Sequence, residues 1–402
     1  MVITDKDRIE EALSRRIDAV YPSKGALERV LLSGKRLRIY LGIDPTGPSL
    51  HLGHASNLLA LKKFQELGHE IILLVGDFTA MIGDPTGKLS ARKQLSPKEV
   101  KRNMKTFKKQ AGKLISFSGR NSAKLKFNSK WLGKLTFSDV VKLAAQVTVG
   151  QMLKRDMFQK RMEGNKEIYL HEFLYPLMQG YDAVAMDVDM ELGGSDQTFN
   201  MLIGRDLMRK IKDKEKFVIT TKLLENPKTG EKLMNKSEGG LVNLDDKPAD
   251  MFGKIMALDD EVMFTLAEFS SEMPMEKVRE LERKVGGGMN PRDAKLVIAR
   301  EIVALVHGDS EADKAREEFI KIFSDKELPD EMPEIEVGGE ISLVGLLMKA
   351  GVKSKSEARR LIIQNAVKIN DEVHSDIRET LFPKSGDVLK VGKHHFYRLT
   401  RK

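Results

Sequence analysis

The sequence predicts an α/β protein: a parallel sheet covered by helices, then an α-helical region and a small region of mixed α and β structure. Short apolar runs typical of strands alternate with helical stretches from residue 38 to about residue 219. That alternation favours a parallel sheet with right-handed crossovers. The pattern is helical from about residue 248, and a basic segment with one helix and two hairpins follows an acidic stretch. The expected divisions of the chain are 1–247, 248–323, 324–340 and 341–402.

The first region is expected to place its ligand site beyond the ends of its strands. Its predicted strands lie at residues 38–44, 71–77, 124–128 and 183–190. Its predicted helices lie at residues 58–67, 97–114, 137–160 and 172–179. Because open parallel sheets bind ligands beyond the carboxyl ends of their strands, the loops after these strands are the expected site.

The clearest helix of the second region is expected between Asn290 and Gly308. Asn290 suits the N-cap, Pro291 the first helical position and Gly308 the position just past the helix. One apolar stripe of this helix is expected to be core; it consists of Leu296, Ala299, Val303 and Val306.

Residues 324–340 are expected to form an extended linker, because they contain seven acidic residues, two prolines and a Gly-Gly pair. In the segment that follows, Ser354 and Glu357 have the spacing of a capping box that opens a helix. Two hairpins are expected after that helix, one turning at or near Asn370 and the other around Gly392.

The net charge of +9 is concentrated at the end of the chain. Residues 341–402 hold 13 Lys and Arg against six Asp and Glu, whereas the 340 residues before them carry only two excess positive charges. Such an excess is typical of a surface that binds a polyanion, most simply nucleic acid. A merely basic domain is the alternative, and charge alone does not decide between the two.

Composition excludes several classes of protein. The 402 residues are 41% hydrophobic and 32% charged, a globular balance that argues against wholesale disorder. The sequence has no cysteine, which excludes disulfides, thiolate nucleophiles, zinc fingers and iron–sulfur clusters. No apolar run approaches the roughly 20 residues of a membrane helix, and the charged N-terminus has no secretory signal pattern. A cytoplasmic protein is therefore expected.

A turn and a histidine pair follow the first predicted strand. Residues 44–54 read Asp-Pro-Thr-Gly-Pro-Ser-Leu-His-Leu-Gly-His, and a helix is expected to begin near His51. His51 and His54 would share one face at a helix N-terminus, which favours anions, and Gly53 would let a nucleotide approach the backbone. Such a pair alone also binds metals or simply packs, but its place at a strand-to-helix junction favours phosphate binding.

A second candidate for phosphate binding is the loop at residues 232–237, Lys-Leu-Met-Asn-Lys-Ser, which glycines flank. Lysines on a mobile loop can neutralise the charge of a departing pyrophosphate. On its own, such a loop is more often solvated surface.

Together, these two elements resemble the HIGH and KMSKS signatures of the class I aminoacyl-tRNA synthetases. The second signature departs from the family pattern. With Lys236 and Ser237 aligned, Leu233 stands at the first lysine position and Asn235 at the first serine position. Lys232 lies one residue early, which leaves its role open and makes Lys236 the stronger candidate.

Further segments resemble the bacterial tyrosyl-tRNA synthetases in order and approximate spacing. They read YLGIDPT from residue 40, GDPTGK from residue 83, YPLMQGYD from residue 175 and GGSDQ from residue 193. The final segment KSKSEARRLIIQNAVKIN resembles the S4 RNA-binding domain that ends those enzymes. The resemblance implies a Rossmann-like catalytic domain, an α-helical domain and a small α+β S4 domain.

The residues themselves agree with a tyrosine pocket. Tyr175, Gln179 and Asp182 have the spacing of one helix face. Asp182 and Tyr40 could both hydrogen-bond a phenolic hydroxyl, and phenylalanine would then leave a buried carboxylate unpaired. The alternative for Asp182 is a turn residue, and Trp131 is expected only to pack. The resemblance implies that tyrosine is bound by Tyr40, Asp84, Tyr175, Gln179, Asp182 and Gln197.

The resemblance also implies an ATP site and a catalytic set. The residues expected to bind ATP are Gly42, Asp44, Thr46, His51, Gly53, His54, Gly194, Asp196, Met234, Lys236 and Ser237. The residues expected to stabilise charge on the phosphates are His51, His54, Lys88, Arg92 and Lys236. Mg²⁺ is expected to arrive with ATP and to have no dedicated protein site.

The basic residues of the S4-like segment are expected to contact RNA phosphates and shape rather than bases. They are Lys353, Lys355, Arg359, Arg360 and Lys368. A solvated helix face is the alternative. The resemblance further implies a homodimer, with tRNA(Tyr) spanning the two subunits.

The implied reaction is the ligation of tyrosine to tRNA(Tyr) in two steps: activation with ATP, which releases pyrophosphate, and transfer of the tyrosyl group to the 3′ end. Three alternatives remain. A tryptophanyl-type synthetase shares the architecture, but Tyr40 and Asp182 argue against it. A small-molecule adenylyltransferase would need neither the basic end nor the loop at 232–237. A catalytically inactive S4-type RNA-binding protein on this scaffold is supported only by Leu233 and Asn235.

Overall fold

The computed structural model describes residues 1–86, 94–234, 241–324, 332–370, 372–392 and 395–401. The contacts within it divide the chain into two units. The first unit comprises residues 1–246 and 256–308, and the second comprises residues 247–255 and 309–402. The predicted division into a separate helical domain at 248–323 stays a prediction.

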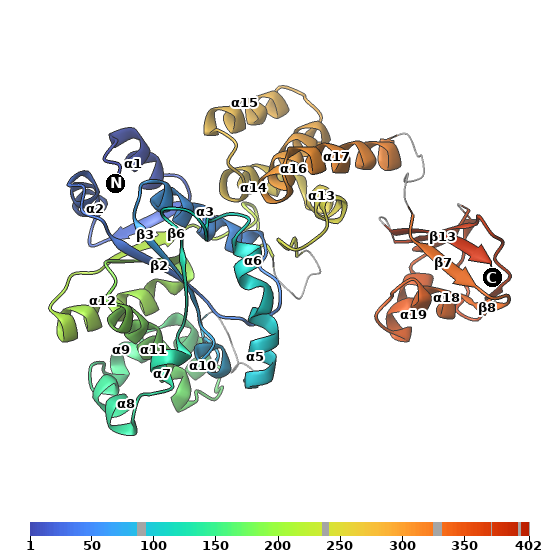
Figure 1. The fold of residues 1–402 in the computed structure, drawn as a ribbon. Helices are drawn as coiled ribbons and strands as arrows, with labels where there is room; N and C mark the ends of the chain where they lie inside the picture. Colours follow the sequence, from blue (N-terminus) through green and yellow to red (C-terminus); the bar gives the residue numbers. More distant parts are fainter. Residues whose placement is uncertain (87–93, 235–240, 325–331, 371, 393–394, 402) are drawn as a thin grey trace. The chain divides into compact units, whose positions relative to one another are not determined.

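The first unit is built around a six-stranded sheet (Figure 1). In spatial order its strands are β1 (Ile17–Tyr21), β6 (Phe217–Thr221), β5 (Met190–Gly194), β2 (Arg38–Ile43), β3 (Glu70–Val75) and β4 (Lys124–Phe127). The edge strand β1 pairs antiparallel with β6, and the four other pairings are parallel. The parallel sheet with helical crossovers confirms the predicted α/β class.

Helices cover both faces of this sheet. Figure 1 shows α3 on one face and α11 with α12 on the other. The helices up to the last strand of this sheet are α1 (Lys6–Ala12), α2 (Lys24–Leu32), α3 (Leu52–Glu66), α4 (Thr79–Ile82), α5 (Pro97–Asn103), α6 (Phe107–Ala111), α7 (Ser129–Leu132), α8 (Phe137–Ala144), α9 (Val149–Leu153), α10 (Asp156–Glu163), α11 (Leu170–Met186) and α12 (Thr198–Lys212). Single 3₁₀ turns lie at Met104–Thr106 (η1) and Ser195–Gln197 (η2).

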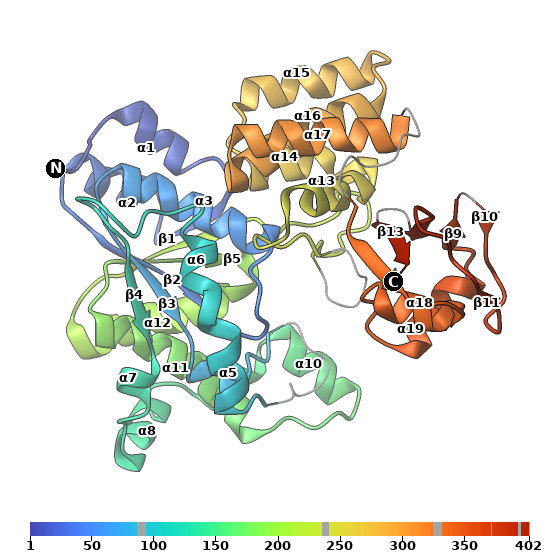
Figure 2. The ribbon, with the colours of Figure 1, turned by 45° about the vertical axis from the view of Figure 1, so that its right-hand side comes forward.

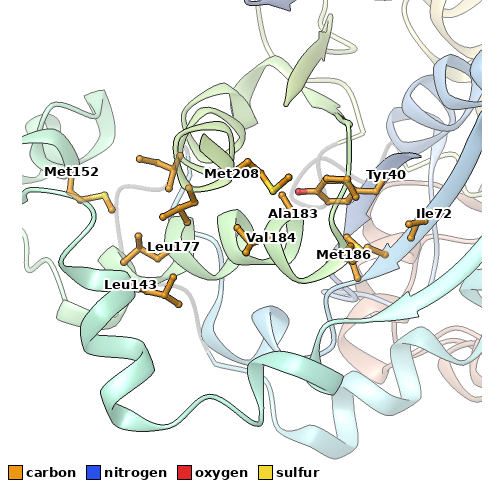
Figure 3. Packing of buried hydrophobic residues seen from close by; sticks show 13 residues of the cluster. Tyr40, Ile72, Leu143, Met152, Leu177, Ala183, Val184, Met186 and Met208 are labelled. Atoms are coloured by element: carbon orange, nitrogen blue, oxygen red, sulfur yellow. The ribbon is translucent and has the colours of Figure 1, made fainter. Parts of the chain in front are cut away.

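A hydrophobic cluster joins α11 and α12 to the sheet (Figure 3). Tyr40 and Ile72, which are neighbours in register on β2 and β3, contribute from the strands. Ala183, Val184 and Met186 contribute from the end of α11. This packing fixes the helix that carries the predicted tyrosine-binding residues.

The strand predicted at residues 183–190 is wrong. Helix α11 continues to Met186, Asp187 ends it in the left-handed conformation with φ 50°, and strand β5 begins only at Met190. The apolar alternation of this short segment matches a strand, but the three buried residues at the end of α11 follow helical spacing into the cluster. The tertiary contact decides the conformation.

Two predicted long helices are interrupted. The stretch at 97–114 is divided into α5, a 3₁₀ turn and α6, and the stretch at 137–160 into α8, α9 and the start of α10. Thr148 starts α9 anew by accepting from the N–H of Gln151, as part of a capping box. Strands β1 and β6 were not predicted.

The first unit ends in helices that lie side by side: α14 (Met263–Ser270), α15 (Met275–Gly286) and α16 (Pro291–His307), with the 3₁₀ turn η4 (Asp260–Val262) before them (Figure 2). The caps predicted for α16 are confirmed: Asn290 accepts from the N–H of Arg292, Pro291 is the first residue, and Gly308 ends the helix with φ 88°. All four residues of its predicted apolar stripe are buried.

The second unit combines helices with a small sheet. Helices α13 (Pro248–Ala257) and α17 (Asp309–Ser324) bring the rings of Phe252 and Phe319 to 5.4 Å between centroids. The sheet has the order β10 (Glu372–Val373), β9 (Val367–Ile369), β12 (Val388–Val391), β13 (His395–Arg401) and β7 (Glu334–Val337). A pair formed by β8 (Ile341–Ser342) and β11 (Thr380–Leu381) and the helices α18 (Leu343–Lys349) and α19 (Lys355–Ile363) complete it.

The expected linker at 324–340 is partly a strand. Residues 334–337 form β7, which pairs in parallel with β13 and buries Ile335 and Val337. In β7, exposed glutamates alternate with these two buried apolar residues, so the acidic composition of the segment hides the strand pattern. Both predicted hairpins are present as the antiparallel pairs β9–β10 and β12–β13, and Ser354 accepts from the N–H of Glu357 to open α19.

Among the described residues, no helix is both long enough and apolar enough to cross a membrane.

Candidate active site

The loops beyond the parallel strands of the first unit enclose a cleft of about 660 Å³. The predicted tyrosine- and ATP-binding residues that the structure describes all line it: Tyr40, Gly42, Asp44, Thr46, His51, Gly53, His54, Asp84, Tyr175, Gln179, Asp182, Gly194, Asp196, Gln197 and Met234. Four predicted residues lie outside the described parts of the chain: Lys88, Arg92, Lys236 and Ser237. The fold thus brings together segments that are up to 194 positions apart in the sequence.

The histidine pair forms the N-terminal cap of α3. Nδ1 of His51 accepts from the N–H of Gly53 at 3.2 Å, and the His51 N–H donates to Nδ1 of His54 at 3.1 Å. The two ring centroids lie 3.9 Å apart. A Cβ on Gly53 would lie 3.0 Å from the His51 ring, so this glycine also makes room for the imidazole. Both rings therefore sit at a helix N-terminus, where the backbone favours an anion.

Asp44 connects the turn after β2 with α11. Its Oδ2 accepts from the hydroxyl of Tyr175 at 2.8 Å, and its Oδ1 accepts from the hydroxyl of Thr79 at 2.7 Å. Burial, and then the carboxylate of Asp44, raise the pKa of Tyr175 well above its usual value. Tyr175 is therefore a neutral donor, and a predicted ATP residue and a predicted tyrosine residue form one hydrogen-bonded pair.

Asp182 is buried inside α11 and accepts two hydrogen bonds. The indole Nε1 of Trp131 donates to its Oδ1 at 2.7 Å, and Nδ2 of Asn128 donates to its Oδ2 at 3.1 Å. Burial raises the pKa of Asp182 well above its usual value, although both donors favour the charged form. The alternative of a turn residue is wrong for Asp182, and so is the expectation that Trp131 only packs.

Asn128 was missed by the sequence analysis. Besides Asp182, its amide donates to the hydroxyl of Thr79 at 3.0 Å, and its Oδ1 accepts from the N–H of Phe78 at 2.9 Å. It directly follows β4, at the carboxyl end of a parallel strand, and this position was the signal that could have found it.

Tyr40 extends from β2 toward the helical layer of α11, as Figure 3 shows. Only 1% of its surface is exposed, and its hydroxyl has no hydrogen-bond partner among the described residues. Burial, and then the nearby carboxylate of Glu191, raise the pKa of Tyr40 well above its usual value. A neutral hydroxyl close to Glu191 therefore lines the same cleft as Asp182.

Asp84 and Gln197 form a second polar group in the cleft. Nε2 of Gln197 donates to Oδ2 of Asp84 at 2.8 Å, while the N–H and the hydroxyl of Thr86 donate to Oδ1. Arg155, which directly precedes α10, donates to the hydroxyl of Thr86 at 2.7 Å and lies over the ring of Phe199, 4.7 Å from its centroid. No spacing in the sequence links Arg155 to this group, because the contact is made only by the tertiary fold.

On the ATP side of the prediction, Asp196 is partly exposed and Met234 is buried. Nζ of Lys232 lies 2.9 Å from Oδ2 of Asp196, and the side chains are 49% and 32% exposed. Met234 is buried, and its sulfur accepts from the N–H of Val242 at 3.4 Å. Lys232, which lies one residue early in the signature, thus contacts Asp196, a residue predicted to bind ATP.

The predicted RNA-binding residues of the second unit separate into two sets. Those on and beside α19 are exposed: Lys353, Lys355, Arg359 and Arg360. Lys368 lies on β9 between the core residues Val367 and Ile369, so it points to the sheet face that α19 does not cover. There it stands directly opposite Lys390 of β12.

Comparison with known proteins decides the family. Residues 32–324 match the model of the "tRNA synthetases class I (W and Y)". A "Tyrosine--tRNA ligase" of Carboxydothermus hydrogenoformans is 45% identical over 99% of both chains. The chain belongs to the tyrosine–tRNA ligases of class I. Another tyrosine–tRNA ligase, from Thermotoga maritima, is 43% identical over 96% of both chains.

Solved structures of this ligase family share the fold. The C-terminally truncated mitochondrial tyrosyl-tRNA synthetase of Aspergillus nidulans has a TM-score of 0.66 and 25% identity, over 79% of this chain and 94% of its own. A tyrosyl-tRNA synthetase from Archaeoglobus fulgidus, solved in complex with L-tyrosine, has a TM-score of 0.60 and 21% identity, over 78% of this chain and all of its own. The second comparison speaks for the fold alone.

Proposed function

We propose that this chain joins tyrosine to tRNA(Tyr) in two steps, by forming tyrosyl-adenylate from tyrosine and MgATP and then transferring the tyrosyl group. The observation that carries the proposal is the composition of one cleft. A buried hydroxyl near Glu191 that meets no partner in hydrogen-bond geometry among the described residues (Tyr40) and a buried carboxyl (Asp182) line the same cleft as the histidine pair at the N-terminus of α3.

Tyrosine is proposed to bind with its phenol between Tyr40 and Asp182. The hydroxyl of Tyr40 and the carboxyl of Asp182 can each hydrogen-bond the phenolic group. Phenylalanine would leave both groups buried and unsatisfied, which costs more than a hydrogen bond contributes. The residues proposed to hold the remainder of tyrosine are Asp84, Tyr175, Gln179 and Gln197.

ATP is proposed to bind with its phosphates at the N-terminus of α3 and its ribose at Asp196. A carboxylate oxygen of tyrosine attacks the α-phosphorus, the bond from that phosphorus to the bridging oxygen breaks, and pyrophosphate leaves with the negative charge. His51 and His54 stabilise this charge with donors and the helix N-terminus. Lys88, Arg92 and Lys236 are proposed to act on the pyrophosphate. Gly42, Asp44, Thr46, Gly53, Gly194, Met234 and Ser237 complete the proposed ATP site.

In the second step a ribose hydroxyl at the 3′ end of tRNA(Tyr) attacks the carbonyl carbon of the adenylate, and AMP leaves. The exposed basic residues on and beside α19 are proposed to bind tRNA phosphates, because they are cationic and lie in the segment that carries most of the net charge. Lys368, on the other face of the sheet, is proposed as a separate contact with the same RNA. Mg²⁺ is proposed to enter with ATP, and the cytoplasm is the proposed location because tRNA and ATP are used there.

A homodimer is proposed from an exposed apolar surface on the first unit. On α8, Phe137 is 84% and Val141 is 51% exposed, and they share one helix face. Val149 on α9 and Leu170 on α11 are also exposed. Large apolar side chains gathered in this way are typical of a surface that a partner covers, and a second copy is the proposed occupant. The homodimer would be supported if the wild-type protein has twice the monomer mass in solution and the Phe137→Glu variant has the monomer mass.

The experiment that tests the proposed function is ATP–pyrophosphate exchange with each of the twenty amino acids and Mg²⁺. Exchange with tyrosine alone is expected, and it would show that the loop with Leu233 and Asn235 supports the reaction. Exchange with tryptophan would keep the class and contradict the pocket. No exchange by folded protein that still binds RNA would favour the inactive RNA-binding alternative.

A further inference from the structure

We propose that a buried ion pair, Glu191–Lys216, acts as a positioning device that orients the amide of Gln179 toward the ammonium group of tyrosine. This inference rests on the proposed function and adds to it two residues that neither the motifs nor the proposed site includes. It concerns the floor of the cleft on the α11 side of the sheet.

Glu191 belongs to the wall of the cleft. It lies on β5 directly beside Tyr40 of β2 in the parallel register, so both side chains stand on the same face of the sheet. It lines the cleft and is only 2% exposed. Its Oε1 accepts from Nε2 of Gln179 at 3.1 Å. A buried carboxylate therefore supports a predicted tyrosine-binding residue directly.

Lys216 holds Glu191 from behind. It directly precedes β6, its side chain is fully buried, and its Nζ forms an ion pair with Oε2 of Glu191. A Cβ on Gly204 of α12 would lie 2.7 Å from this Nζ and 3.2 Å from Cα of Gly180, so the ammonium packs closely against α12 at this glycine. Nζ also lies 5.9 Å from the ring centroid of Tyr40. The helix, the strand and the aromatic ring thus confine the ammonium at Glu191.

The charge of Glu191 determines how Gln179 faces the cleft. An ionised carboxylate only accepts hydrogen bonds, so the NH₂ of Gln179 must face it and the amide oxygen is left for another donor. The ammonium of an amino acid is such a donor. A neutral Glu191 would itself carry an O–H donor, which favours the opposite amide orientation and turns the NH₂ toward the ammonium.

Lys216 is the cation that pairs with Glu191. The other groups around the pair are the hydroxyl of Tyr40 on β2, the carboxyl of Asp182 on α11 and the guanidinium of Arg205 on α12. Arg205 forms its own ion pair with Glu215. Without Lys216, Glu191 and Asp182 would be two buried carboxyl groups near one another with no cation between them, so Glu191 would no longer be held as the acceptor for the NH₂ of Gln179.

Two variants separate positioning from folding. Lys216→Met leaves Glu191 buried and unpaired, and it is expected to raise the KM for tyrosine about tenfold or more, as for a lost hydrogen bond to a charged group. Glu191→Leu/Lys216→Met replaces the pair by apolar groups, which usually keeps or raises stability. It should unfold at or above the wild-type temperature and still show the raised KM. Lys214→Met is the matched control, because it removes a partly exposed ion pair between residues that lie two positions before Lys216 and Glu191 in the sequence, Lys214 and Asp189. It should leave the KM for tyrosine and the KM for ATP unchanged.

Exchange kinetics with each substrate provide a readout that a general loss of folding would not give. The KM for tyrosine should rise in both variants, while the KM for ATP should stay within twofold of wild type. A folded double variant with a tyrosine KM within twofold of wild type would overturn the proposal, and a folded Lys216→Met variant with such a KM would overturn the role of Lys216. Wild-type protein without tyrosine-dependent exchange would instead overturn the proposed function.

Discussion

The tyrosine end and the nucleotide end of the cleft are built differently. At the tyrosine end, Asp182 and Gln179 are held by buried or partly buried neighbours at 2.7–3.1 Å. At the nucleotide end, Asp196 and Lys232 meet in one ion pair that solvent reaches. Hydrogen bonds gain most from burial, because an unsatisfied group cannot return to water. With the proposed site assignment, selection among similar amino acids would fall where water is excluded, and ATP, a strongly charged ligand, would bind where solvent reaches.

The largest expected effect is at the phosphates. His54→Ala should lower kcat for adenylate formation roughly 10²–10³-fold, because it removes a donor that acts on charge developing in the transition state. The KM for tyrosine should change little, since the imidazole lies at the cap of α3 rather than beside Asp182. Stopped-flow measurement of adenylate formation separates the two quantities.

A control for this variant is His171→Ala, which removes an imidazole that pairs with Tyr169 and does not line the cleft. It should leave the rate unchanged. A rate for His54→Ala within about threefold of wild type would contradict the assigned role and remove the contrast between the two ends.

A smaller effect is expected at the tyrosine end. Trp131→Phe keeps an aromatic ring but removes the donor to Oδ1 of Asp182. Leaving a buried acceptor without its donor costs about 1–3 kcal/mol, so kcat/KM for tyrosine should fall roughly 5–150-fold. The KM for ATP should stay the same. Exchange assays with tyrosine and with phenylalanine measure the effect.

The phenylalanine assay shows which physical role the indole has. Phenylalanine offers no hydroxyl to Asp182, so its own kcat/KM should be nearly unchanged and the discrimination between the two amino acids should fall. An equal loss for tyrosine and phenylalanine would mean that the indole supports the pocket by its packing and that its hydrogen bond to Asp182 does not contribute to selection.

The two ends also differed in how far the sequence could predict them. The cap of α3 follows from residues within four positions of one another, and the predicted start near His51 is confirmed. The partners of Asp182 come from residues more than 50 positions away, and no local spacing announces them. Asn128 could have been found from its place after β4, whereas the indole of Trp131 could not.

The same division applies to the fold. The alternation of strands and helices predicted the parallel sheet, and the caps predicted α16, because both signals are local. Strand β1 and strand β7 were missed, since each exists through pairing with a distant strand. The lysine of the buried pair with Glu191 resembles any surface lysine in the sequence, and only the packing around Gly204 distinguishes it.

The smallest effect is expected for Lys232, whose pair with Asp196 is the exposed counterpart of Lys216–Glu191. Lys232→Met should lower the KM for ATP by no more than about fivefold, because the half-exposed pair contributes 0–1 kcal/mol and its loss frees Asp196 for the ribose. The KM for tyrosine should stay constant, in contrast to Lys216→Met. Lys228→Met, which removes another exposed ion pair, with Glu261, is the control. A rise of more than fivefold in the KM for ATP that salt suppresses would contradict the expected small effect. It would mean that Lys232 binds the triphosphate, in place of the lysine that the signature lacks at Leu233.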